Sequence, residues 1–252
     1  MRQKFVAGNW KMHKDKSETI ELISSLKNKL SNFSVITEVA ICPPFTSLEL
    51  ASELIKNSTL KLGAQNVHSE PEGAYTGEIS AKMLKSFGVE YVIIGHSERR
   101  TYFNESNEFI NKKIKRAIEF DLRPIFCVGE TLNEREAGKT FSVVEEQLIL
   151  GLQGISESDL LKIVIAYEPV WAIGTGKTAT PLQAQEVHFF IREKIKSIYD
   201  TKSSEKIKIL YGGSVKPENA RDLFLQPDID GGLIGGACLN PDSFFKIILS
   251  AE

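Results

Sequence analysis

The 252-residue sequence has little cysteine: only Cys42, Cys127 and Cys238, all far apart along the chain. An odd number of widely spaced thiols predicts no disulfide framework and no cysteine-based metal site. Each lies in or beside an apolar run, where cysteine behaves as a small hydrophobic residue. We therefore expect reduced, buried thiols in a cytoplasmic protein that carries no metal.

The sequence also lacks an excess of charge of one sign and has no long apolar run. Thirty-one basic and 33 acidic residues give a net charge of -2, and no block of like charge stands out. This balance predicts neither nucleic acid nor a membrane surface as a partner. The first residues, "MRQKFVAGNW", lack the apolar core of a signal peptide, and no stretch has the length of a membrane span.

A nucleotide-binding P-loop is absent despite the suggestive run "WAIGTGKT", residues 171–178. A P-loop places its first glycine five positions before the glycine of the Gly-Lys-Thr triplet, and that position is Trp171 here. The triplet should also open directly into a helix, but the next helix start that the sequence predicts is Pro181. The glycines of this run need another explanation.

What the sequence does contain is a regular alternation of strand and helix patterns. Eight short apolar runs recur: "KFVAG", "EVAICP", "LKLGAQ", "VEYVIIG", "LRPIFCVG", "KIVIAYE", "IKILYGG" and "DGGLIGG". Segments of helical period separate them, such as "SETIELISSLKNKL", "SNEFINKKIKRAIEF" and "QAQEVHFFIREKIKSIY". The spacing of about thirty residues per unit is what a βαβ unit needs.

Strands without polar alternation are buried on both faces, which indicates a parallel sheet covered by helices. Such units could form an open doubly wound sheet or a closed (β/α)8 barrel. An open sheet favours a Gly-x-Gly-x-x-Gly fingerprint after the first strand, and "FVAGNWKMHK" has none. Eight strands suit closure. We predict that residues 1–252 form one domain, a (β/α)8 TIM barrel.

In such a barrel, chemistry occurs where strands end, because the carboxyl ends of all strands meet at one mouth. Asn9 and Lys11 follow the first strand and would point to the same side of an extended chain. His96 follows the fourth strand, directly before Ser97 and Glu98, which are residue types that begin helices. A helix N-terminus beside the imidazole predicts that it stays neutral. The alternatives are a surface lysine and a structural histidine.

Glu168 ends the sixth apolar run, where a carboxylate has few ways to be solvated, and Pro169 holds it in an extended conformation. It is a candidate base, with a solvated cap or an ion pair as the alternatives. The stretch from 169 to 178 mixes large apolar residues with glycines. This composition is typical of a closing lid, in which Val170, Trp171 and Ile173 exclude water.

Paired glycines follow the last two strands, in "YGGSVKPENA" and "IGGACLNPDSF". Each pair precedes a predicted helix with proline at its first position, Pro217 and Pro241. Glycine lets backbone N–H groups turn toward a ligand, so these two loops predict an anion site without a cationic side chain. Tight turns alone are the alternative.

The chain closely resembles the triosephosphate isomerase family from end to end. The resemblance is carried by "AGNWKM", "AQNVHSEPEGAYTGEIS", "IIGHSERR", "CVGETLNEREAGKT", "AYEPVWAIGTGKTATPLQAQEVH", "YGGSV" and "DIDGGLIGGA". It implies interconversion of dihydroxyacetone phosphate and D-glyceraldehyde 3-phosphate through an enediolate, in glycolysis and gluconeogenesis, with no cofactor and no metal.

The resemblance also implies a role for each matching residue. Glu168 would be the base and His96 a neutral electrophile. Ser97 and Glu98 would support these two residues without contacting the substrate. Lys11 would offset negative charge, and Asn9 would position the substrate oxygens. The phosphate would bind the backbone N–H groups of four residues: Gly174, Ser214, Gly235 and Gly236. The lid would consist of Pro169, Val170, Trp171, Ala172, Ile173, Gly174, Thr175, Gly176 and Lys177.

The long third loop, residues 65–78, exceeds the usual length of a βα connection. In the family, Thr76 and its neighbours insert into a second subunit, which implies a homodimer. Two residues depart from the family pattern. Cys238 stands where serine is usual, beside the phosphate loop, and Asn104 replaces a common glycine; we expect neither to affect the catalytic set.

Two other hypotheses share this fold. A different phosphosugar enzyme on the same barrel would normally need a Schiff-base lysine or metal-binding carboxylates inside the barrel, and the strand runs contain neither. A non-catalytic binder of a phosphate metabolite is conceivable because fold alone does not determine function. It predicts the loss of Lys11, His96 or Glu168, and all three are present.

Overall fold

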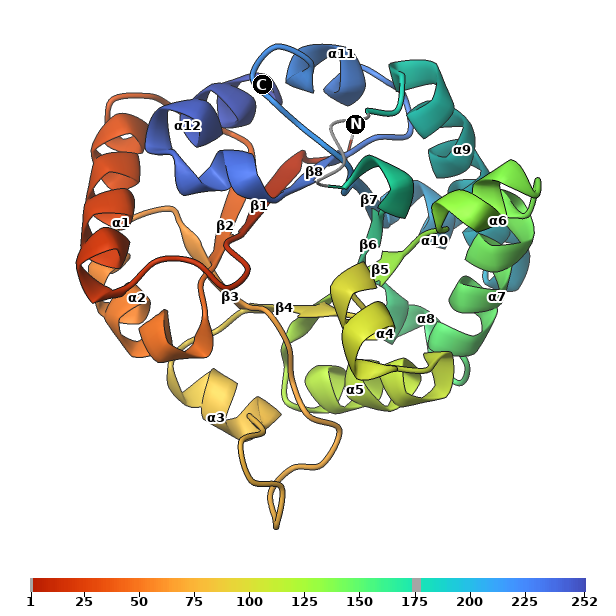
Figure 1. The fold of residues 1–252 in the computed structure, drawn as a ribbon, viewed down its shortest axis with the longest axis horizontal. Coiled ribbons are helices and arrows are strands. Elements are labelled where there is room, and N and C mark those ends of the chain that lie inside the picture. The colour runs from red at the N-terminus through yellow and green to blue at the C-terminus, as the bar shows by residue number, and fades with distance from the viewer. Residues whose placement is uncertain (1, 174–177) are drawn as a thin grey trace.

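The computed structural model describes residues 2–173 and 178–252, and its eight parallel strands form a closed barrel ringed by helices (Figure 1). Each strand pairs with its neighbour in the sequence, and β8 pairs with β1. The predicted TIM barrel is confirmed. The strands are β1 Phe5–Asn9, β2 Glu38–Cys42, β3 Lys61–Ala64, β4 Tyr91–Ile94, β5 Arg123–Val128, β6 Val164–Tyr167, β7 Lys208–Tyr211 and β8 Gly231–Ile234.

Helices cover the outside of the barrel. The α-helices are α1 Lys16–Ser31, α2 Leu48–Leu54, α3 Ala81–Ser86, α4 Ser97–Phe103, α5 Asn107–Glu119, α6 Leu132–Glu136, α7 Thr140–Gly151, α8 Glu157–Leu160, α9 Pro181–Ile198, α10 Thr201–Lys206, α11 Ala220–Phe224 and α12 Pro241–Leu249. Three short 3-10 helices are η1 Phe45–Ser47, η2 Val170–Ala172 and η3 Gly236–Leu239. No helix in the described ranges is both long and apolar enough to cross a membrane.

Local sequence signals explain where the helices begin. Asp15 caps α1 through a reciprocal capping box with Glu18. Thr180 and Gln183 form the same motif at α9, whose first residue is Pro181. Proline fits there because the first N–H of a helix has no intrahelical partner. The start predicted at Pro181 is confirmed, and so is the absence of a helix directly after Thr178.

The strands are buried on both faces, as their apolar runs predict. Alternate side chains fill the barrel interior, and they are Phe5, Ala7, Ala40, Cys42, Tyr91, Ile93, Ile125, Cys127, Val164, Ala166, Leu210 and Leu233. The other strand side chains pack against the helices in a larger cluster. All three cysteines are buried and free, and burial raises the pKa of Cys42 to about 12. The prediction of buried thiols is confirmed.

The two departures from the family pattern lie at different kinds of position. Cys238 is fully buried, and a Cβ on Gly8 would lie 3.2 Å from its sulfur. It therefore packs against β1 rather than facing the mouth. Asn104 ends α4 with a left-handed backbone, φ 52°. Among residues other than glycine, asparagine tolerates this conformation well, which explains how it serves at a helix end.

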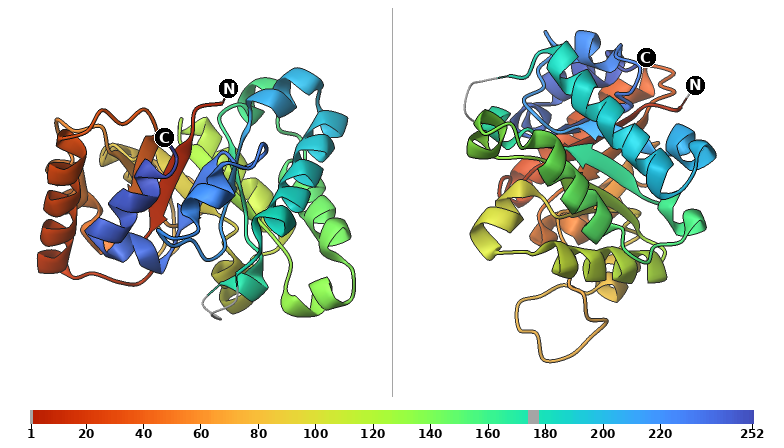
Figure 2. Two further views of the ribbon diagram at one scale, coloured as in Figure 1. Left: turned by 90° about the horizontal axis from the view of Figure 1, so that it is seen from above. Right: turned by 90° about the vertical axis from the view of Figure 1, so that its right-hand side faces the viewer.

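The loop between β3 and α3 projects beyond the ring of helices, in contrast to the compact connections elsewhere (Figures 1 and 2). It carries Thr76, which is exposed. The carboxyl ends of the strands, from one of which this loop extends, surround the cavity described next.

Candidate active site

A cavity of about 450 Å³ lies at the carboxyl ends of the strands. Residues from loops after strands β1, β4, β6, β7 and β8 line it. The seven residues predicted for catalysis or phosphate binding that line it are Asn9, Lys11, His96, Glu168, Ser214, Gly235 and Gly236, and the predicted lid residue Ile173 lines it too. Side chains separated by more than 200 positions in the chain therefore share one pocket, as barrel closure predicts.

Glu168 lies directly after β6 and is only 2% exposed. Its Oε1 is 3.0 Å from Nε2 of His96, and its Oε2 accepts a hydrogen bond from the backbone N–H of Ser97 at 2.9 Å. Burial alone would raise the pKa of Glu168, but the charge and hydrogen bond of His96 and the Ser97 N–H lower it below its ordinary value. The carboxylate is thus ionised and held at both oxygens.

His96 caps the N-terminus of α4. Its Nδ1 accepts a hydrogen bond from the backbone N–H of Glu98 at 3.2 Å, which leaves Nε2 to donate to Glu168. Burial disfavours the imidazolium, yet the charge of Glu168 and the hydrogen bond to it raise the pKa of His96 above its ordinary value. The Glu98 N–H acts in the opposite direction, because a protonated Nδ1 would face another donor. The prediction of a neutral His96 considered only the helix N-terminus and did not take the carboxylate of Glu168 into account.

Lys11 lines the cavity, but its backbone conformation differs from the one predicted from the sequence. Its φ is 53°, so the expectation of an extended chain from Asn9 to Lys11 is wrong. Its N–H instead donates to Oδ1 of Asn9 at 3.0 Å. Gln65 fixes the turn by donating from Nε2 to the carbonyl of Lys11 at 2.8 Å. The ammonium lies 2.5 Å from Oε1 of Glu98.

The described part of the predicted lid begins with the 3-10 helix η2. Nε1 of Trp171 donates to Oε1 of Glu130 at 2.9 Å, and the guanidinium of Arg135 lies 4.6 Å from the centre of the Trp171 ring. Glu130 is fully buried. Sequence reasoning missed Glu130 and Arg135, although both lie in the quoted motif "CVGETLNEREAGKT". The other predicted lid residues, Gly174, Thr175, Gly176 and Lys177, lie outside the described residues.

The two glycine pairs differ in the space around them. A Cβ on Gly212 would lie 2.9 Å from Cγ of Glu168, and one on Gly213 would lie 2.3 Å from the hydroxyl of Tyr211. Packing therefore requires glycine at both positions. Around Gly236 a Cβ would meet no described atom within 4 Å, and at Gly235 only Cε of Lys11, at 3.7 Å. This second pair leaves room for a ligand close to the backbone.

The helix starts after these glycines agree with the prediction in one loop only. Pro241 is the first residue of α12. Pro217 is not at a helix start, because it lies in a turn and α11 begins at Ala220. Lys216, the first charged residue after "YGGSV", also lines this cavity and was not among the predicted site residues.

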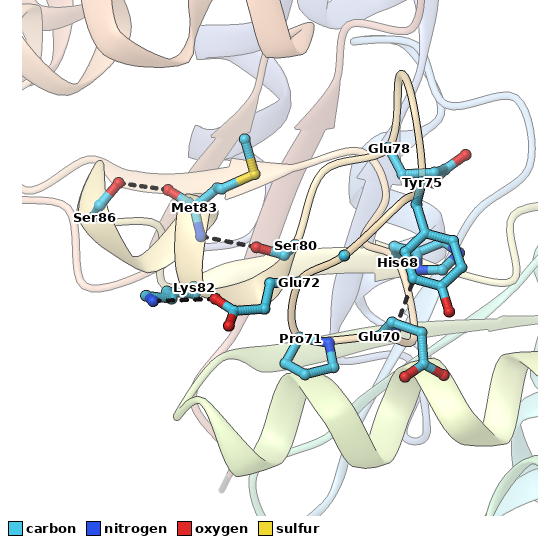
Figure 3. A pocket seen from close by; sticks show the side chains of 11 residues that line it. His68, Glu70, Pro71, Glu72, Tyr75, Glu78, Ser80, Lys82, Met83 and Ser86 are labelled. Atoms are coloured by element: carbon cyan, nitrogen blue, oxygen red, sulfur yellow. Dashed lines mark hydrogen bonds and ion pairs between the residues drawn. The ribbon is translucent and has the colours of Figure 1, made fainter.

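A second large cavity, of about 470 Å³, lies beside the projecting third loop (Figure 3). The ring of Tyr75 packs on His68 with 4.4 Å between ring centres, and Nδ1 of His68 accepts a hydrogen bond from the N–H of Glu70. Neither Glu168 nor His96 lines this cavity. Thr76, in the same loop, is exposed and does not line the cavity that holds Glu168 and His96.

Comparison with known proteins gives a consistent result over the whole chain. A family model described as triosephosphate isomerase matches residues 4–251. A triosephosphate isomerase of Chloroherpeton thalassium is 55% identical over 252 residues, covering 100% of both chains. Relatives with the same name from Alkaliphilus metalliredigens and Dictyoglomus turgidum are 53% and 54% identical, covering 98% and 99% of this chain and 99% and 100% of their own.

Proposed function

Because the chain belongs to the triosephosphate isomerase family, it is an isomerase of dihydroxyacetone phosphate and D-glyceraldehyde 3-phosphate, and we propose that Glu168 is the base of this reaction. The observation that carries the proposal is the pairing of Glu168 with His96 in the wall of the cavity that Lys11 also lines. Moving a proton between adjacent carbons requires a carboxylate, an oxyanion stabiliser and exclusion of water.

Glu168 must give up contacts before it can act. Both of its oxygens are held, one at His96 and one at the Ser97 N–H. These contacts lower the pKa of Glu168, whereas its burial raises it. Releasing the contacts while the site stays closed to water therefore makes the carboxylate a stronger base. The substrate, by occupying His96 through its own oxygen, would produce this release.

His96 and Lys11 would stabilise the oxygen on which charge develops. Nε2 of His96 carries the proton that the substrate carbonyl needs, since Nδ1 already accepts from the Glu98 N–H. The ammonium of Lys11 supplies a positive charge within the same cavity, and Asn9 holds the Lys11 backbone through Oδ1. Preorganised donors of this kind stabilise a developing oxyanion more than the ground-state carbonyl.

The phosphate would bind the N–H groups of Ser214, Gly235 and Gly236. In the described part of the chain, none of these three donates a backbone hydrogen bond within the protein. The open space around Gly236 lets an oxygen approach the backbone. The fourth predicted donor, Gly174, belongs to the lid. Lid closure would exclude water and so prevent loss of phosphate from the enediolate.

A homodimer formed through the third loop is also part of the proposal. Tyr75, in the loop itself, and Met83, on α3, are 46% and 49% exposed and line one cavity. Contiguous exposed apolar residues mark interaction surfaces. The whole chain would act as one domain in the cytoplasm without a cofactor, where its free cysteines stay reduced.

The test is a coupled assay of D-glyceraldehyde 3-phosphate isomerisation with the wild type and Glu168→Gln. We expect the substitution to reduce turnover by about a hundredfold to ten-thousandfold, the usual contribution of a positioned base. Binding of inorganic phosphate should persist. Glu136→Gln, which changes an exposed carboxylate on α6, is the matched control. Near-normal turnover in Glu168→Gln would remove Glu168 from this role.

A further inference from the structure

Gln147 is a buried polar residue on α7 that holds the loop after β5. Its Oε1 accepts a hydrogen bond from the N–H of Gly129 at 2.7 Å, and its Nε2 donates to the carbonyl of the same residue at 3.1 Å. One side-chain amide therefore binds both backbone groups of Gly129. Gln147 does not line the substrate cavity, so any effect that it has on the reaction must pass through Gly129.

Gly129 lies where the pairing of β5 with β6 continues past the ends of both strands. The N–H of Glu168 donates to the carbonyl of Val128 at 2.7 Å, and the N–H of Val170 donates to the carbonyl of Glu130 at 3.1 Å. The N–H and carbonyl of Gly129, between these two contacts, bind α7 instead. Because backbone groups need hydrogen-bond partners, the amide of Gln147 serves here as a neighbouring strand would.

The backbone of Gly129 packs directly against the backbone of the proposed base. A Cβ on Gly129 would collide with the carbonyl oxygen of Glu168 and would lie 2.6 Å from its carbonyl carbon and 3.2 Å from its Cα. The two backbones therefore touch at a distance that only glycine permits. Any shift of Gly129 would displace the residue from which the carboxylate extends to His96.

Gly129 is also bonded to the residue that anchors the described start of the lid. The carboxylate of Glu130 is fully buried and accepts from Nε1 of Trp171 at 2.9 Å. The hydroxyl of Tyr167 lies 3.1 Å from each of its oxygens. The loop that Gln147 holds thus contacts the base through Gly129 and the lid through Glu130.

We propose that Gln147 is a positioning residue of the isomerase, which fixes the base and the start of the lid together through the backbone of Gly129. The inference rests on the proposed roles of Glu168 as base and of residues 169–177 as lid. Without the amide, both backbone groups of Gly129 lose their partners, and unpaired groups are costly unless the loop moves to find new ones. A displacement of about 1 Å at a reacting group can reduce catalysis by about a hundredfold.

Two substitutions remove the contact in different ways. Gln147→Met keeps the length of the side chain and removes both hydrogen bonds to Gly129. Gln147→Glu keeps an acceptor for the N–H of Gly129 and removes only the donor to its carbonyl, so it provides a second test if the methionine variant does not fold. Urea unfolding and circular dichroism identify the variants that are folded under the conditions of the assay.

Val144→Ala is the matched control for stability. Val144 is fully buried in the same helix, and its truncation weakens the packing of α7 without removing a hydrogen bond. A purely structural role of Gln147 predicts that both variants lower the free energy of unfolding and leave the kinetics of the folded enzyme unchanged. A positioning role predicts kinetic changes in the Gln147 variants alone.

We expect turnover to fall by about tenfold to a hundredfold in folded Gln147→Met, because the base is displaced. The affinity for inorganic phosphate should change little, since the proposed donors Ser214, Gly235 and Gly236 lie in other loops. Release of inorganic phosphate per isomerisation should rise, because a lid with a displaced anchor excludes water less well from the enediolate. Val144→Ala should show none of these kinetic changes.

Normal turnover and normal phosphate release in folded Gln147→Met or Gln147→Glu would overturn the positioning role. The same kinetic losses in Val144→Ala would also overturn it, because they would follow from the weaker packing of α7. A fall in turnover without added phosphate release would overturn the effect on the lid. Full activity of Glu168→Gln would instead overturn the proposed base, so the two failures are distinguishable.

Discussion

Oε1 of Glu168 lies 3.0 Å from Nε2 of His96, so the proposed base and the proposed electrophile bind each other. Each group alters the protonation of the other: the pKa of Glu168 is lowered and that of His96 is raised. A substrate oxygen that replaces Glu168 at Nε2 removes both effects together. Binding would therefore favour the stronger base and the neutral imidazole in one step.

The first prediction concerns the pKa of His96. Glu168→Gln removes the negative charge that raises it, while burial, which lowers it, remains. The Glu98 N–H at Nδ1 also continues to favour the neutral ring. We expect the pKa of His96 to be lower in Glu168→Gln than in the wild type, by titration of the labelled imidazole nitrogens in NMR. Equal values would show that the carboxylate does not control the ring.

The second prediction concerns a glycine of the active site. Gly212→Ala places a Cβ 2.9 Å from Cγ of Glu168 and 3.1 Å from the carbonyl oxygen of Tyr167. The base must shift, and a displacement of about 1 Å can reduce catalysis by about a hundredfold. We expect turnover to fall far more than the affinity for inorganic phosphate, measured by steady-state kinetics and calorimetry.

Glu136→Ala is the control, because Glu136 is exposed on α6 and does not line the cavity that holds Glu168. Turnover should therefore stay much closer to the wild type than in Gly212→Ala. Equal losses in the two variants would contradict the assignment of Gly212 to packing against the base.

The barrel could be predicted because the sequence patterns that specify its strands and helices are local. Each strand is a short apolar run buried on both faces, and α9 begins at a capping box with proline in its first turn. Strand ends then predict where Glu168 and His96 lie. The turn at Lys11 could not be predicted in this way. Its left-handed conformation depends on Gln65, which reaches it from beyond β3 only after the barrel has closed.

The contact between Glu130 and Trp171 could not be predicted either, for the same reason. They are 41 residues apart and hydrogen-bond each other through Nε1 and Oε1. Nothing in the local sequence of either predicts this pairing, since it depends on the adjacency of the loops after β5 and β6. Pro217 shows the converse error, because a good helix-start signal lies in a turn three residues before α11 begins. The sequence therefore predicted where the site residues lie, but it did not predict the long-range contacts that hold them in place.

The third prediction concerns the third loop. Thr76→Arg would place a charge at the surface proposed to insert into a second subunit, and burying an unpaired charge is costly. We expect the sedimentation coefficient to shift from dimer to monomer and the activity to fall on dilution. Leu182→Arg, on α9 at 75% exposure, lies elsewhere on the ring and is the control (Figure 1). A dimer of unchanged affinity in Thr76→Arg would contradict this interface.

The fourth prediction concerns stability in acid. Burial lowers the pKa of His188 from its ordinary 6.5 to about 3. Because the unfolded chain takes up this proton first as the pH falls, the free energy of unfolding should decrease between pH 6.5 and about 3. The contribution of one such group is about 1.4 kcal/mol per pH unit.

His188→Leu removes this titration. The carbonyl of Asp228, which contacts Nδ1 of His188, keeps a hydrogen bond from Arg192, so the substitution leaves it satisfied. Nε2 of His188 has no hydrogen-bond partner in the described part of the chain, and its loss breaks none there. Urea unfolding at several pH values should give a shallower acid slope than the wild type. His13→Leu, at an exposed position, should keep the wild-type slope. An equally steep slope in His188→Leu would mean that other groups account for the acid sensitivity.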